Sequence, residues 1–95
     1  MKNSNVVDYF RNNKKAKSSN GNLSTDGQKL YSYNLLIGIT KNNKKLVLNV
    51  MSPNFYSIST SHHVSLAKNI SDEIINPIPK RIGYGVWYEF PKEYL

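Results

Sequence analysis

This chain has 95 residues, a formal net charge of +7 and no cysteine. A length of this order suits a single small domain, here residues 1–95, and the lack of cysteine excludes a disulfide framework and a thiolate zinc site. The longest apolar stretch runs only from Leu35 to Ile39, whereas about 20 residues are needed to cross a bilayer. We therefore expect a cytoplasmic protein that has no membrane partner.

The amino-terminal residues carry a helical pattern. Asn5 is a candidate N-cap, and Val6, Val7 and Phe10 follow at helical spacing. Four cations come next in the chain: Arg11, Lys14, Lys15 and Lys17. Because cations are favourable at the carboxyl end of a helix, we expect this helix to end near Lys17.

Further along the chain, the pattern becomes extended. Three runs resemble strands: Leu30 to Tyr33, Leu35 to Thr40 and Lys45 to Met51. Between the last two runs stands Lys41-Asn42-Asn43-Lys44, and asparagine tolerates the positive φ that a tight hairpin turn requires. We expect an antiparallel β-hairpin or a three-stranded meander in this region.

A second amphipathic helix is expected in the carboxyl half. The residues Ser59 to Ser61 are candidate N-caps. Four apolar residues at spacings of three and four then form one stripe: Val64, Ala67, Ile70 and Ile74. Pro77 ends this helix, and Tyr84 to Phe90 alternates well enough to be a carboxyl-terminal strand, paired within the domain or across a dimer.

Together these elements predict an α+β fold: an N-terminal helix, an antiparallel hairpin or meander, a second amphipathic helix and a C-terminal strand. A chain this short leaves much of its surface wet even when folded. Since association is a common way to gain the missing stability, we expect a homodimer.

The positive charge is concentrated in two blocks. Residues 1–17 contribute +4, and residues 29–45 contribute another +4. Tyr31 and Tyr33 lie in the second block near Lys29, and period two places both rings on one strand face, either to stack on bases or to pack under a helix. Lysine outnumbers arginine by eleven to two, which an AT-rich coding bias also produces. Cations beside exposed rings nevertheless favour nucleic-acid binding.

A third group of candidate contacts is the segment Ser59 to His63. Hydroxyls and imidazoles at the start of a helix can donate to a phosphate, although one hydroxyl could simply cap the helix and a histidine could simply face solvent. The predicted nucleic-acid-binding residues are Arg11, Lys14, Lys15, Lys17, Lys29, Tyr31, Tyr33, Lys41, Lys44, Lys45, Ser59, Thr60, Ser61, His62 and His63.

His62 and His63 also raise the hypothesis of a small metal-independent ribonuclease. Adjacent residues on a helix point about 100° apart, so the two imidazoles are not expected to flank one phosphate. The sequence shows no other catalytic motif. We expect no catalytic residue, no metal site and no cofactor.

The middle of the chain resembles a group of small proteins encoded by phages of Gram-positive bacteria. The resemblance covers roughly residues 22 to 68 and rests on four pieces: Asn22 to Gly27, Leu30 to Tyr33, Asn49, and Tyr56 to His63. Those proteins usually have threonine where this chain has Ser59. The resemblance implies a strand-rich core with flanking helices and a phage origin. Small early phage genes frequently encode inhibitors of host machinery, including anti-CRISPR proteins.

The basic blocks, taken together with this resemblance, predict a non-catalytic, RNA-binding phage accessory protein in the cytoplasm of a bacterial host cell. It would inhibit a host system, with RNA-guided CRISPR immunity of type III as the sharpest hypothesis. The expected partners are RNA and a host CRISPR effector complex or another host protein. The alternative is a protein-protein inhibitor of a host enzyme that uses no nucleic acid and anchors through Trp87, Tyr88 and Tyr94. A small ribonuclease is the third hypothesis.

Overall fold

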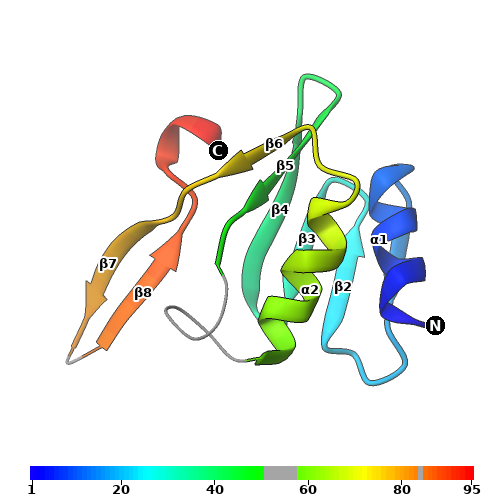
Figure 1. Ribbon diagram of the computed structural model, residues 1–95, viewed down its shortest axis with the longest axis horizontal. Coiled ribbons are helices and arrows are strands. Elements are labelled where there is room, and N and C mark those ends of the chain that lie inside the picture. The colour runs from blue at the N-terminus through cyan, green and yellow to red at the C-terminus, as the bar shows by residue number, and fades with distance from the viewer. Residues whose placement is uncertain (51–57, 84) are drawn as a thin grey trace.

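The computed structural model describes residues 1–50, 58–83 and 85–95, with the backbone alone at 82 and 85–87. Two helices, α1 (Asn3–Arg11) and α2 (Ile58–Lys68), lie side by side over one face of a sheet (Figure 1). The strands are β1 (Lys15–Lys17), β2 (Leu23–Asp26), β3 (Lys29–Ser32), β4 (Leu35–Lys41), β5 (Lys44–Leu48), β6 (Glu73–Ile75), β7 (Ile78–Ile82) and β8 (Gly85–Glu89), and a short 3-10 turn, η1 (Lys92–Tyr94), follows. Within the described ranges, no helix has both the length and the apolar character that a bilayer crossing needs.

The main sheet has six strands in the order β1 to β6. The first five form an antiparallel meander, and β6 joins parallel to β5 after the chain has crossed over through α2. The strands β7 and β8 pair with each other as a separate two-stranded sheet beside the main one (Figure 1). The expected α+β class is confirmed, although the meander is longer than the sequence predicts.

The predicted hairpin is confirmed as β4 and β5. Lys41 lies opposite Lys44, and the two residues between them, Asn42 and Asn43, have φ values of 53° and 64°. Two successive left-handed residues are what a two-residue hairpin turn requires. The predicted carboxyl-terminal strand corresponds to β8, which is paired within the chain; Tyr84 and Met51, at the edges of two predicted strands, lie outside the described residues.

The first helix is shorter than predicted because Asn13 ends it. Asn13 has a φ of 60°, its backbone N–H donates to Phe10 O, and the N–H of Lys14 donates to Tyr9 O. These two bonds and the left-handed residue form the Schellman ending of a helix. At its other end, α1 begins at Asn3, so Asn5 lies inside the helix and is not its N-cap. After the helix, Lys15 begins a strand.

The second helix also differs from the prediction. It begins at Ile58 and ends at Lys68, so Ser59 to Ser61 are helical residues rather than caps, and Ile74 belongs to β6. Asp72 redirects the chain: its N–H donates to Lys45 O at 2.8 Å, and its Oδ2 accepts the N–H of Lys45 at 2.7 Å. A short apolar run fits a helix stripe and a buried strand equally well by periodicity, and the pairing with β5 decides between them.

The core lies between the helices and the sheet. Phe10 is fully buried, and its ring lies so close to β4 that a methyl group at Gly38 would come within 3.2 Å of Phe10 Cε2 and Cζ. The same methyl group would lie 3.2 Å from Leu30 Cβ. Gly38 is therefore the position that lets α1 pack directly on the strands.

Substituting Gly38→Ala should lower the free energy of unfolding by about 1–3 kcal/mol, since the added methyl overpacks a close contact. Denaturant unfolding measures this as a lower midpoint with an unchanged m-value. In the double variant Phe10→Leu/Gly38→Ala, the smaller side chain makes room, so the combined loss should be smaller than the sum of the single losses. Additive losses would contradict the proposed contact.

Candidate nucleic-acid interface

Three strands place a lysine, a serine and a tyrosine in one row. Lys17 of β1 lies opposite Ser24 of β2, which lies opposite Tyr31 of β3. Directly opposed residues share a face of the sheet, and residues two apart on a strand do so as well, which adds Lys15 and Lys29 to this face. We call these five residues, Lys15, Lys17, Ser24, Lys29 and Tyr31, the basic sheet face.

The basic sheet face is hollowed between its lysines and its tyrosine. An open hollow of ≈ 480 Å³ is lined by Lys15, Ala16, Lys17, Ser24, Thr25, Asp26 and Tyr31. Ser24 is the small residue in the row, so it forms a floor between two longer side chains. Tyr31 is half-buried and the three lysines are exposed. One side of the Tyr31 ring therefore lies next to exposed lysines.

Asp26 is the acidic residue in this hollow, and it serves the β2–β3 turn. Its carboxylate accepts the backbone N–H of Lys29 at 2.8 Å and that of Gln28 at 2.9 Å. These two hydrogen bonds lower the pKa of Asp26 below its usual value. The carboxylate therefore stays charged while it holds the turn, and its negative charge lies on the same face as the three lysines, directly opposite Lys15.

Other predicted cations lie outside the hollow beside Tyr31. Lys14 is exposed in the link between α1 and β1, and Lys44 is exposed at the β4–β5 turn. Lys41 is also exposed, and its Nζ donates to Glu93 O at 2.8 Å. Together with Lys29, Lys41 lines a second hollow beside η1. The structure thus groups part of the predicted set and disperses the remainder.

Lys45 is buried, although the sequence predicts it as a phosphate contact. Only 5% of its surface is exposed, and its Nζ donates to Asn13 Oδ1 and Thr40 Oγ1 at 2.6 Å each. The same nitrogen lies 4.4 Å from the centroid of the Phe10 ring, a favourable cation–π distance. Burial lowers the pKa of Lys45, while the charge of Asp72 opposes that shift.

Tyr31 and Tyr33 do not share a strand face as predicted. β3 ends at Ser32, and Tyr33 has a left-handed φ of 57°, which breaks the period-two alternation. The Tyr33 ring is 47% exposed and lies 6.1 Å, centroid to centroid, from the ring of His63 in α2. Tyr33 is therefore on the helix side, apart from Tyr31.

The predicted hydroxyl and histidine cluster is mostly buried. Ser59 and His62 are exposed, whereas Thr60, Ser61 and His63 are buried. The burial of these three residues removes them from any surface phosphate contact. It also separates the two imidazoles, since His63 faces the core and His62 faces solvent, so they do not meet the ribonuclease geometry of two rings at one phosphate.

A buried hydrogen-bond chain occupies this cluster instead. Ser32 Oγ lies 2.6 Å from His63 Nδ1 and 3.0 Å from Thr60 Oγ1. Ser32 is fully buried, so its hydroxyl links β3 to α2 inside the core. Burial lowers the pKa of the His63 imidazole, and the neighbouring His62 lowers it further.

The aromatic residues of the rival hypothesis are only partly accessible. Tyr88 and Tyr94 are half-buried and pack against the core, whereas the side chain of Trp87 lies outside the described residues. In the described ranges, no three histidine, cysteine, aspartate or glutamate side chains gather in a way that could hold a metal ion.

Comparisons of this chain with protein-family models, with curated proteins and with solved structures give no match. The candidate site therefore stands on its geometry. Ser24 and the asparagines around Lys45 are residues that sequence reasoning missed, because neither a lone serine in a strand nor a scattered asparagine carries a motif.

Lowering the pH should destabilise the folded chain through His63. The unfolded chain binds a proton at this imidazole as pH falls through about 6.5, the ordinary value, whereas the folded chain binds it only at lower pH. The contribution of His63 to the free energy of unfolding is therefore fully present above that pH and declines below it. Denaturant unfolding between about pH 7.5 and 5 measures the loss.

The variants His63→Asn and His62→Asn separate the two imidazoles. We expect His63→Asn to be less stable at neutral pH but to lose the pH dependence in this window, because the buried titrating group is gone. His62→Asn should keep most of that dependence. The opposite pattern would show that the buried network is not its source.

Proposed function

We propose that this protein binds single-stranded RNA on the basic sheet face and does not cleave it. The observation that supports the proposal most directly is the row of Lys17, Ser24 and Tyr31, with Lys15 and Lys29 beside it. Sheet-surface aromatic rings stack on unpaired bases, and neighbouring cations neutralise the phosphates that connect those bases.

The size of the hollow favours a single strand. A space of ≈ 480 Å³ beside one ring can receive a splayed base, whereas the bases of a duplex stay paired and stacked. In this arrangement, the base lies against Tyr31, and the flanking phosphates reach Lys15 and Lys17. Ser24 lets the base approach because its side chain is short.

Replacing the stacking ring should weaken binding. Tyr31→Ala removes the surface for the base and should cost about 1–3 kcal/mol of binding free energy for a single-stranded RNA of roughly ten nucleotides. Tyr31→Phe keeps the ring and should retain most of the affinity. Fluorescence anisotropy with a labelled oligonucleotide measures both variants.

The lysines are tested through the salt dependence of the same binding. Lys15→Ser/Lys17→Ser should reduce the slope of log K against log salt by about 1.4, because each single-strand phosphate contact contributes about 0.7. The matched control is Lys2→Ser/Lys92→Ser, which removes two exposed charges that do not line the hollow beside Tyr31 and should change the slope little. Equal effects of the two pairs would mean that net charge alone drives binding. If the unaltered chain shows no salt-sensitive binding at all, RNA is excluded as its ligand.

We further propose that the protein is a phage accessory protein that inhibits RNA-guided immunity in the bacterial cytoplasm. In this proposal it acts as a homodimer, and its partner is a host effector complex. Expression of the chain in a host with a type III system should lower interference against a targeted phage. The variant Tyr31→Ala/Lys15→Ser/Lys17→Ser should lose this effect. Full inhibition by that variant would favour a protein-protein inhibitor that uses no RNA.

A further inference from the structure

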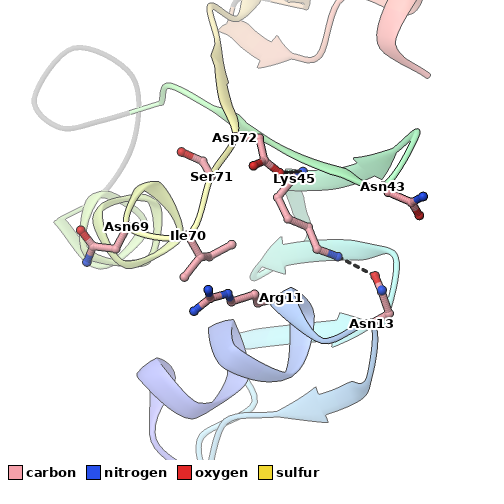
Figure 2. Close-up of a pocket in the computed structure, with 8 residues that line it drawn as sticks. All are labelled: Arg11, Asn13, Asn43, Lys45, Asn69, Ile70, Ser71 and Asp72. Atoms are coloured by element: carbon pink, nitrogen blue, oxygen red, sulfur yellow. Dashed lines mark hydrogen bonds between the residues drawn. The ribbon is translucent and has the colours of Figure 1, made fainter.

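A polar pocket lies on the helix side of the sheet. Three segments that are distant in sequence converge there: the end of α1, the β4–β5 turn and the link from α2 to β6 (Figure 2). The pocket has a volume of ≈ 300 Å³, and its lining residues are Arg11, Asn13, Asn43, Lys45, Asn69, Ile70, Ser71 and Asp72. Seven of these eight side chains are polar, which is unusual for a small hollow beside a core.

Lys45 Nζ forms no ion pair within the described residues, although the charge of the nearby Asp72 acts on it. The Lys45 residue is only 5% exposed, and its ammonium group donates to the neutral oxygens of Asn13 and Thr40. Asp72 uses its Oδ2 to accept the backbone N–H of Lys45 instead. Buried charges in proteins are normally compensated by opposite charges, and here Asp72 opposes one of the two cations, so Arg11 and Lys45 leave the pocket with one net positive charge.

Three exposed side chains of the lining, those of Arg11, Asn43 and Asn69, are further hydrogen-bond donors that a ligand can reach. Arg11 lines the pocket next to Ile70 (Figure 2), and its guanidinium has no hydrogen bond or ion pair among the described residues. The side-chain amides of Asn43 and Asn69 likewise have no partner within the described part of the chain. A guanidinium and two amides can donate several hydrogen bonds to one tetrahedral anion.

We infer that this pocket binds a phosphomonoester, with Arg11 holding the phosphate in a two-point contact and the Lys45 charge completing the balance. Arg11 and Lys45 outweigh Asp72 by one positive charge in this pocket, and this balance favours an anionic group such as a phosphate monoester. Asp72 and Ser71 offer acceptor oxygens on the pocket wall, which fit hydroxyl groups of an attached sugar. A nucleoside monophosphate or the terminal phosphate of an RNA strand would supply this chemistry.

Binding is tested with the full chain by titrating inorganic phosphate and adenosine monophosphate, with adenosine as the neutral control. Saturable shifts of the backbone amide resonances of residues 11, 13, 43, 45 and 69–72 are expected with the two phosphates and not with adenosine. Arg11→Gln should weaken binding by about tenfold or more, because it removes a charge-assisted two-point contact. Lys14→Gln, at an exposed cation outside the pocket lining, should change binding less than about twofold.

The two sources of the phosphate are separated by comparing short RNAs that carry a 5′-phosphate or a 5′-hydroxyl. Stronger shifts of the pocket resonances with the phosphorylated RNA identify a strand end, whereas binding of the monophosphate alone identifies a free nucleotide. No saturable shift at about 10 mM of either phosphate, well above a millimolar dissociation constant, would overturn the inference, as would equal losses in Arg11→Gln and Lys14→Gln. Since Tyr31 does not line this pocket, failure here leaves the RNA proposal to its own test.

Discussion

The left-handed backbone of Asn13 is the constraint on which the arrangement of this protein depends. It ends α1 after Arg11, turns the chain into β1, and places its side-chain oxygen 2.6 Å from Lys45 Nζ. The next turn has to fit against it: a Cβ at Gly27, which has a φ of 106°, would lie 2.9 Å from Asn13 O. Asn13 therefore contacts or forms part of the end of α1, the turn into β1, the β2–β3 turn and the site of the buried Lys45.

This early helix end divides the positive charge between two surfaces. Arg11 stays with the helix and lines the polar pocket, whereas Lys15 and Lys17 continue onto a strand and face the opposite side of the sheet beside Tyr31. A helix that ran to Lys17 would have gathered all these cations on one solvated cylinder. The two proposed binding surfaces thus follow from one change of backbone direction.

Several residues with side chains that often bind ligands are part of the buried core in this protein. Ser32, Thr60 and His63 form a buried hydrogen-bond chain, and Lys45 is buried above the Phe10 ring. Hydroxyls, imidazoles and ammonium groups have the same chemistry inside a protein as on its surface. Their role here is set by burial, which a composition or a spacing does not reveal.

The sequence by itself determined the α+β class, the β4–β5 hairpin with its two asparagines, and a basic, aromatic region near Tyr31, because turn chemistry and strand alternation are local properties. The tertiary structure alone decided that Ile74 joins a parallel strand, that Tyr33 leaves the face of Tyr31, and that Lys45 and His63 are buried. These outcomes depend on contacts between distant segments, such as Asp72 with Lys45 and Ser32 with His63. Periodicity along the chain carries no information about which distant residues will meet.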